Sequence, residues 1–286
     1  MLTEKDYLIT IREDLHNTRQ YRISQEISYT LEDFQYHNEI ETDLSLTLVS
    51  KTETGHVFEI GMLKQWQLKT DGLDRWDKDM APLRKNLQIE TDLSGTMRQV
   101  LNIEEVKDLW QELRPAVAEK YAGDEESKTV INASVALLYA PGELEKVLQS
   151  SYLYHAVLPG LYHQKFDRQN DFTLKGSRVV PNAIGTASLP FNTQIKLQQY
   201  DPFTEECQLK ISGQIDQDAL DKDNISALLR GLTDIYNLKT EVQGFHMEDY
   251  SFDRFHWIKE SAQLTQYAIE GSLMFRNLCT LKLLNN

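Results

Sequence analysis

Histidine is the residue type in this chain best suited to acid–base or metal chemistry. Two of the seven histidines, His246 and His256, could face each other across a hairpin with Glu248 nearby. Two histidines and one carboxylate would suffice for a metal site with open coordination positions. Strand pairing also brings such residues together by chance, and a Pro-Gly break separates His155 from His163. We therefore expect no metal site and no cofactor, and we interpret the histidines as surface or hydrogen-bonded core residues.

Four aspartates cluster just before a predicted helix: Asp216, Asp218, Asp221 and Asp223. Their spacing lacks the glycine and the closing glutamate of a calcium loop. Carboxylates are favourable at a helix start, because they accept hydrogen bonds from its free N–H groups and complement its dipole. We interpret this cluster as a helix cap.

No catalytic motif occurs in the sequence. The nucleophile elbow, the Walker loop and the dinucleotide fingerprint are all absent. Cys207 and Cys279 both lie in strand-like sequence, where buried thiols are expected. We expect no enzyme and name no catalytic residue, although two carboxylates for hydrolysis could still meet in the fold.

Aromatic residues gather in and beside the predicted helical block. They are Trp76, Trp110, Tyr121, Tyr139, Tyr152, Tyr154 and Tyr162. The simpler interpretation is that they fill the core between a sheet and helices. The alternative is that they line a groove for an apolar ligand or for a segment of a partner.

The elements that must position these residues follow from the spacing of apolar side chains. Residues 5–101 alternate as antiparallel strands do, residues 102–158 show helical spacing, and residues 172–283 return to alternation with one helix from Ile225 to Ile235. The runs are long for strands, which suits a curved sheet. We expect an α+β fold in a single domain, 1–286, with a long antiparallel, half-barrel-like sheet that carries the helical block on its concave face.

Several local features make sharper predictions. Gly95 suits a tight turn that would place Ile89 beside Leu101. Asn102 and Glu105 form a capping-box-like pair, and Pro115 should kink or end the helix that they start.

The last three strands are predicted over 239–252, 255–264 and 267–283. Gly271 is a candidate bulge or bend inside the third of them.

Composition limits the partners. The chain has 286 residues and a formal net charge of -14. Its residues are 41% hydrophobic and 26% charged, fractions that are typical of folded globular proteins. That charge argues against nucleic acid and anionic membranes and permits a basic protein partner. The charged opening Met1–Asp6 shows no signal sequence, and no run is long enough to span a membrane. We expect a cytoplasmic location, although removal of a signal would leave similar sequence.

Two stretches carry a resemblance to a known group. They are Glu90–Met97 running into Asn102–Val106, and the tail Phe252–Ile258. In these turns and caps the chain resembles the half-barrel lipoprotein carriers and periplasmic sensors of the LolA/RseB type and similar proteins of Bacteroidetes. The resemblance implies a half-barrel fold and transfers no functional residue.

The leading hypothesis is a non-enzymatic cytosolic binding protein that presents a concave β surface to a protein partner, as an immunity or secretion-accessory protein would. One alternative is a carrier of an apolar small ligand or lipid, which predicts an internal cavity of several hundred Å³ lined by the seven aromatic residues. Another is a hydrolase with an unrecognised site, which predicts a cleft with convergent His, Asp or Glu.

Overall fold

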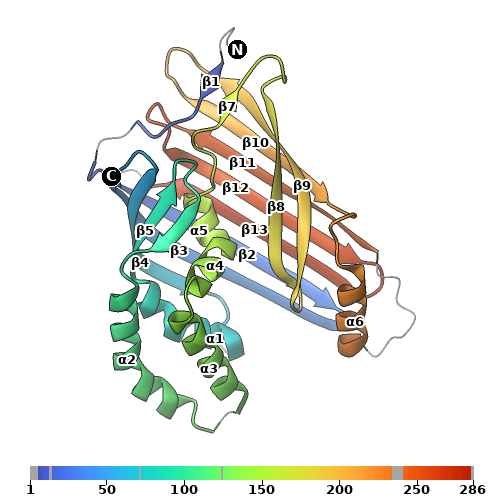
Figure 1. Cartoon of the computed structure of the whole chain (residues 1–286). Coiled ribbons are helices and arrows are strands. Elements are labelled where there is room, and N and C mark those ends of the chain that lie inside the picture. Colours follow the sequence, from blue (N-terminus) through green and yellow to red (C-terminus); the bar gives the residue numbers. More distant parts are fainter. Residues whose placement is uncertain (1–5, 13–14, 71, 124, 234–240, 285–286) are drawn as a thin grey trace. The chain divides into compact units, whose positions relative to one another are not determined.

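The computed structural model describes residues 6–12, 15–70, 72–123, 125–233 and 241–284 (Figure 1). Contacts divide the chain into two compact units. Unit 1 comprises Met1–Glu13, Arg22–Glu41 and Tyr162–Leu283, and unit 2 comprises Asp14–Tyr21, Thr42–Leu161 and Leu284–Asn286. The single domain predicted from the sequence is not tested by this division and stays a prediction.

The long strands form one antiparallel sheet with the order β6-β5-β4-β3-β2-β13-β12-β11-β10-β9-β8. The sheet is open, because β6 and β8 each have one neighbour. Strands β2 (Thr18–Leu31) and β3 (Phe34–Lys51) contribute to both units and have 14 and 18 residues. The predicted α+β class and the long antiparallel strands are confirmed.

Unit 2 holds most of the helices. Its further elements are β4 (Gly55–Gln67), α1 (Gly72–Met80), the 3₁₀ helix η1 (Ala81–Arg84), β5 (Asn86–Asp92), β6 (Met97–Val100), α2 (Ile103–Lys120), α3 (Glu125–Tyr139), α4 (Glu143–Ser150) and α5 (Tyr152–Val157). The helical block therefore lies where the sequence predicts it. Two side chains of α4 tie it to β6: Glu145 accepts a hydrogen bond from the N–H of Val100 at 3.0 Å, and Gln149 donates to the carbonyl of Met97 at 2.7 Å.

Unit 1 adds six long strands, β8–β13, to its parts of β2 and β3. Its elements are β1 (Tyr7–Leu8), β7 (Lys165–Phe166), β8 (Thr173–Ile184), β9 (Ala187–Tyr200), β10 (Cys207–Ile215), α6 (Lys222–Thr233), β11 (Val242–Phe252), β12 (Ile258–Ile269) and β13 (Leu273–Leu283). Helix α6 buries Ile225 and Leu229 completely, in a cluster that includes Phe191 and Tyr267 of the sheet. Burial of each such side chain stabilises the unit by about 1.5–3 kcal/mol.

The predicted cap of α6 is confirmed at Asp221, whose Oδ1 accepts a hydrogen bond from the N–H of Asn224 at 3.1 Å. Asp216 acts earlier, in the preceding turn, where its Oδ1 accepts from the N–H groups of Asp218 and Ala219. The predicted helix end at Ile235 lies outside the described residues.

The β5–β6 hairpin departs from the prediction by one residue. Ile89 pairs with Val100, whereas Leu101 is 43% exposed. A register shift between Glu90 and Thr91 causes the difference, because one extra residue moves the following side chains to the other face. The turn residue itself is as predicted, with Gly95 at a φ of 85°.

The start of α2 also differs in detail. Asn102 occupies the N-cap position, but its side chain makes no cap hydrogen bond. Its Oδ1 instead accepts from the N–H of Gln88 in β5 at 2.9 Å, and its Nδ2 donates to Glu105 at 3.2 Å. The helix runs on through Pro115 to Lys120, so one of the two predicted outcomes, an end at the proline, is wrong.

The last hairpin turns later than predicted. Strand β12 continues to Ile269, and Gly271, with a φ of 74°, forms the turn into β13 instead of a bulge inside a strand. The first predicted strand of this group, 239–252, is observed from Val242, and its first two positions lie outside the described residues.

Candidate functional site

The seven aromatic residues do not meet at one place. Six belong to unit 2, and Tyr162 belongs to unit 1. Trp76 and Tyr121 are brought together edge to face, with ring centroids 5.5 Å apart. Trp110 and Tyr154 are buried, Tyr152 is half-buried, and Tyr139 is 46% exposed and receives a hydrogen bond from Gln111. Tyr162 is buried beside Phe252.

Asp79 is a charged group in contact with one of these aromatics. It accepts hydrogen bonds from Lys120 at 2.5 Å and from the Tyr121 hydroxyl at 2.7 Å. Burial opposes ionisation of Asp79, but these two donors outweigh it and hold the pKa of the carboxyl below its usual range. These hydrogen bonds connect α1 to the end of α2. A ligand-binding role for the seven aromatic residues stays a prediction.

A buried polar network lies in unit 1, where sequence reasoning named only two of its members. Glu248 of β11 is fully buried and accepts hydrogen bonds from Arg178 Nε of β8 at 2.8 Å and from the Tyr250 hydroxyl at 2.6 Å. Its Oε1 also lies 2.8 Å from His246 Nε2. Gln263 of β12 donates to the Tyr250 oxygen at 3.2 Å and extends the network to a third strand.

The charges in this network are set by burial and by Glu248. Burial disfavours the cation of Arg178, but the carboxylate beside it outweighs that effect and raises the pKa of the guanidinium. Burial and the same carboxylate raise the pKa of Tyr250 well above its ordinary value. Arg178 and Glu248 therefore form an ion pair, and Tyr250 is a neutral donor.

The ion pair reaches across two intervening strands. Neighbouring strands lie about 4.8 Å apart, so β8 and β11 would be roughly 14 Å apart in a flat sheet, too far for these two side chains to meet easily. Strands β8–β11 must therefore curl toward this face. Small residues between the two side chains make room for the arginine. Gly176, Thr193 and Gly213 lie side by side on β8, β9 and β10, and Gly213 is paired with His246 on β11.

The curl is tightly packed. A Cβ atom at Gly213 would lie 3.0 Å from Thr193 Cγ2 and 3.5 Å from His246 Cβ. The expected curvature of the sheet is thus present in unit 1, and it is fixed by an ion pair that no local sequence pattern indicates.

The network also contains a hydroxyl, an imidazole and a carboxylate in series. Thr265 Oγ1 lies 2.8 Å from His246 Nδ1, on the side of the ring opposite Glu248. This order is that of an activated nucleophile. Thr265 and Glu248 have no exposed surface and His246 has 4%, so a substrate cannot reach the hydroxyl in this structure. We interpret the series as a structural network.

His256 is not beside His246. Its Nε2 lies 2.5 Å from the Tyr7 hydroxyl and its Nδ1 lies 2.8 Å from the carbonyl oxygen of Thr10, so it ties down the N-terminal segment. Burial lowers the pKa of His256 to about 4 and keeps the ring neutral. In the described part of the chain, no three His, Cys, Asp or Glu residues are grouped as metal ligands would be.

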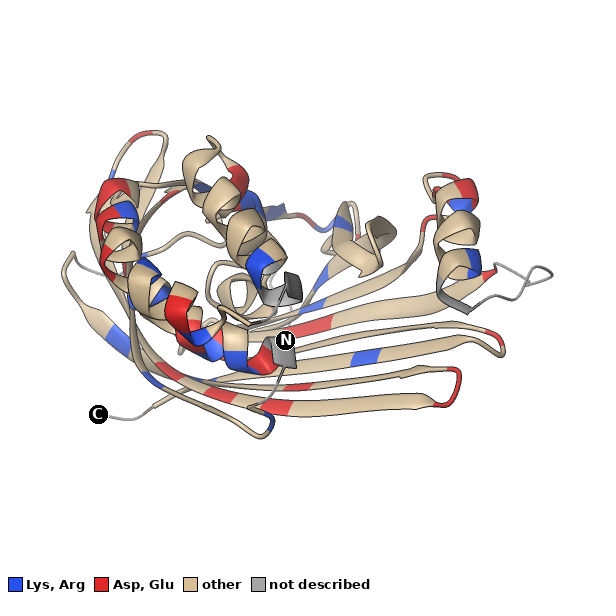
Figure 2. Ribbon diagram, turned by 90° about the horizontal axis from the view of Figure 1, so that it is seen from below, with Lys and Arg blue, Asp and Glu red and all other residues tan. Residues whose placement is uncertain are grey.

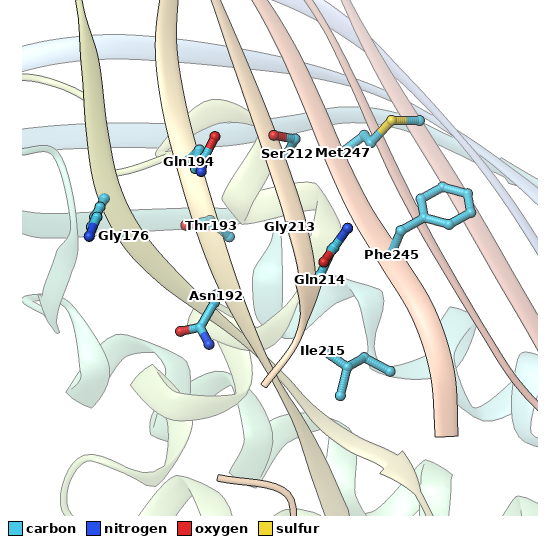
Figure 3. A pocket seen from close by; sticks show the side chains of 11 residues that line it. Gly176, Asn192, Thr193, Gln194, Ser212, Gly213, Gln214, Ile215, Phe245 and Met247 are labelled. Atoms are coloured by element: carbon cyan, nitrogen blue, oxygen red, sulfur yellow. The ribbon is translucent and has the colours of Figure 1, made fainter. Parts of the chain in front are cut away.

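The opposite, solvent-facing side of the same four strands bears a groove of about 720 Å³, which we call the polar groove (Figure 3). Most of its lining comes from two rows of paired residues that lie side by side on neighbouring strands, as the figure shows. Gln194, Ser212 and Met247 form one row, and Asn192, Gln214 and Phe245 form the next. Lys175 of β8 and Ile215 complete the lining together with Gly176, Thr193 and Gly213.

A second groove, of about 300 Å³, lies on β9–β13. It is lined by Gln198, Gln208, Leu209, Asp249, Tyr250, Ser251, Glu260, Ser261, Ala262, Thr280, Leu281 and Lys282. None of the seven aromatic residues lines either groove. The aromatic-lined cavity that a carrier would need is therefore not one of these two sites.

Comparisons with known proteins add little. No protein-family model matches the chain, and no curated protein matches its sequence. A solved structure of lipovitellin with lipid is similar over 95% of this chain, with 9% identity and a TM-score of 0.46, and the chain spans 25% of that protein. DynF from the dynemicin biosynthesis pathway of Micromonospora chersina is similar over 96% of this chain and 84% of its own, with 4% identity and a TM-score of 0.19.

Both TM-scores are low, so neither likeness assigns a function to this chain. The resemblance to the LolA/RseB-like group stays an expectation. Within the described residues, no helix has the length and apolar character needed to span a membrane.

Proposed function

We propose that this protein is a non-catalytic binding protein and that its polar groove holds an extended segment of a protein partner. The groove on the solvent face of β8–β11 is the observation on which the proposal rests. Its volume of about 720 Å³ lies within the range of sites that enclose a ligand.

The groove's side chains suit a peptide backbone. Asn192, Gln194 and Gln214 are exposed and each carries both a donor and an acceptor, which is also what every peptide group offers. Phe245 and Met247 are half-buried beside them and offer apolar area to the partner's side chains. Such a surface can hold an extended segment through its main chain while the apolar residues add affinity.

The groove is shaped before binding. Arg178 and Glu248 hold the curl of β8–β11 from the opposite face, so the lining residues need little rearrangement. A preformed site loses less conformational entropy on binding than a flexible one. A cytoplasmic location and a role as an immunity or secretion-accessory protein are parts of the same proposal that rest on the sequence.

A display selection tests this function. A random peptide library is selected against the purified full chain, and the enriched peptides are then measured against two variants. Ser212→Trp fills the groove from the middle of β10, whereas Met274→Trp places the same bulk at a 51% exposed position outside both grooves.

We expect Ser212→Trp to weaken the enriched peptides by tenfold or more and Met274→Trp to leave their affinity unchanged, with circular dichroism confirming that both variants fold. The proposal fails if no peptide is enriched. It fails equally if Ser212→Trp binds as tightly as the unchanged chain.

A further inference from the structure

The solvent face of β8–β10 carries a local charge opposite to that of the whole chain. The chain has a formal net charge of -14, and charged residues are frequent on the helices but sparse along the long strands (Figure 2). Yet Lys175, Lys196 and Lys210 all lie on this face. Lys175 is paired with the exposed Gln194, and Lys196, two positions after Gln194 on β9, is paired with Lys210.

Two of these lysines oppose each other directly. Lys196 of β9 and Lys210 of β10 are partners across the strand pair. Like charges in that position destabilise a sheet unless each has a partner of opposite charge. Lys196 has such a partner, because its Nζ lies 2.7 Å from Asp171.

The other two lysines have no such partner. Lys175 and Lys210 make no ion pair with any residue in the described part of the chain, although Asp249 stands opposite Lys210 in the second groove. Lys175 lines the polar groove, and the lining contains no Asp or Glu. The polar groove is therefore lined by amides and one lysine without a carboxylate, and Lys210 lies just beyond its lining, two residues before Ser212 on β10.

We propose that the segment held by the polar groove is acidic, with carboxylates that pair with Lys175 and Lys210. The inference rests on the proposed function and adds the chemistry of the partner. Lys175 and Lys210 stand two strands and two residues apart, because Lys175 is level with Ser212, and this separation is about 12 Å in a flat sheet. Acidic residues two to four positions apart in an extended segment, roughly 7–13 Å, reach both lysines.

This inference replaces the basic partner expected from the composition. A bound segment responds to charges within about one Debye length, roughly 8–10 Å, and not to the sum over the chain. Exposed ion pairs contribute modestly, so two of them should change affinity by about tenfold.

Three labelled peptides of about twelve residues test the inference, since roughly six extended residues cross four strands. Each alternates threonine with glutamate, glutamine or lysine, and fluorescence anisotropy with the full chain gives its dissociation constant at about 50 mM and about 300 mM salt. The glutamate peptide should bind about tenfold more tightly than the glutamine peptide, with the difference shrinking at high salt.

Two variants locate the effect. Lys175→Gln combined with Lys210→Gln should remove the preference for glutamate, whereas Lys282→Gln, in the second groove, should keep it. Equal binding of the glutamate and glutamine peptides, both weakened by Ser212→Trp, would overturn the acidic partner and leave the proposed function standing.

Other results would also overturn the inference. Tighter binding of the lysine peptide would restore the basic partner. Inorganic phosphate that displaces the glutamate peptide at micromolar concentration would identify a phosphate site instead. If no peptide binds and the library selection also fails, the proposed function itself is wrong.

Discussion

Replacing Arg178 by methionine should destabilise the protein, because it leaves the buried carboxylate of Glu248 without its cation. Methionine keeps much of the length and apolar area of the arginine stem, so the change removes mainly charge and hydrogen bonding. The Glu248 side chain has no exposed surface and that of Arg178 has 23%. The carboxylate therefore cannot turn to solvent, whereas the guanidinium can.

The magnitude follows from what remains around Glu248. Removing one partner of a buried ion pair typically costs about 3–5 kcal/mol. Here the hydrogen bond from Tyr250 and the contact with His246 persist, and the guanidinium is partly hydrated from the start. We therefore expect Arg178→Met to lower the free energy of unfolding by about 2–3 kcal/mol and Glu248→Gln by about 1–2 kcal/mol.

Urea unfolding followed by circular dichroism measures both values, and the double variant closes a thermodynamic cycle. Arg178→Met with Glu248→Gln removes both charges at once, so its loss should be smaller than the sum of the single losses by about 1 kcal/mol or more. A loss below about 0.5 kcal/mol for Arg178→Met, the range of surface substitutions, or strict additivity in the cycle, would refute the claim that this ion pair fixes the curl.

Three further changes should alter stability, each measured by the same unfolding assay. The pKa of His256 is about 4 in the folded state and 6.5 in the unfolded state, so the unfolded state binds more protons between these pH values. The free energy of unfolding should therefore fall by up to about 3 kcal/mol as the pH drops from 6.5 to 4. His256→Gln should remove this pH dependence, whereas His37→Gln, at an exposed position, should keep it. Gly213→Ala should cost about 1–3 kcal/mol because its Cβ would lie only 3.0 Å from Thr193 Cγ2. Gly231→Ala in α6 meets nothing within 4 Å and should stabilise by about 0.5–1 kcal/mol, and equal effects of the two changes would contradict the tight packing of the curl. Ile225→Ala should cost about 2–5 kcal/mol, and a loss under 1 kcal/mol would mean that α6 does not cover the core cluster.

Alternation of side chains was enough to predict the long strands. In β3 the buried residues Leu44, Leu46 and Leu48 alternate with half-buried ones, as expected when one face packs on a core and the other meets water. The helical block at 103–157 follows equally from its 3.6-residue spacing. These signals are local, so a single sequence contains them.

Register and side-chain partners were not predictable in the same way. The shift at Glu90 and Thr91 moves one residue and leaves no mark in the polarity of the hairpin. The side chain of Asn102 accepts a hydrogen bond from a β5 N–H and not from its own helix, and this contact depends on where β5 lies. Arg178 and Glu248 are 70 positions apart in the sequence, so only the fold reveals that they pair.

Part of the buried network could have been found. His246, Glu248 and Tyr250 follow one another at every second position on the buried face of β11, where apolar residues are expected. Three polar residues in such a row indicate hydrogen-bond partners on neighbouring strands, since a buried polar group without a partner is costly. The signal predicts a network, although not the strand that supplies the cation.

The two faces of β8–β11 are coupled because one backbone serves both. The ion pair of Arg178 with Glu248 draws the strands together on the buried face, and the polar groove lies on the reverse of the same strands. Flattening the curl would change the spacing between Lys175 and Lys210, and with it the spacing of carboxylates that the groove accepts. Arg178→Met should therefore reduce the preference for the glutamate peptide even under conditions in which the variant is fully folded. If the folded variant keeps the preference unchanged, the groove does not depend on the curl and the two faces act separately.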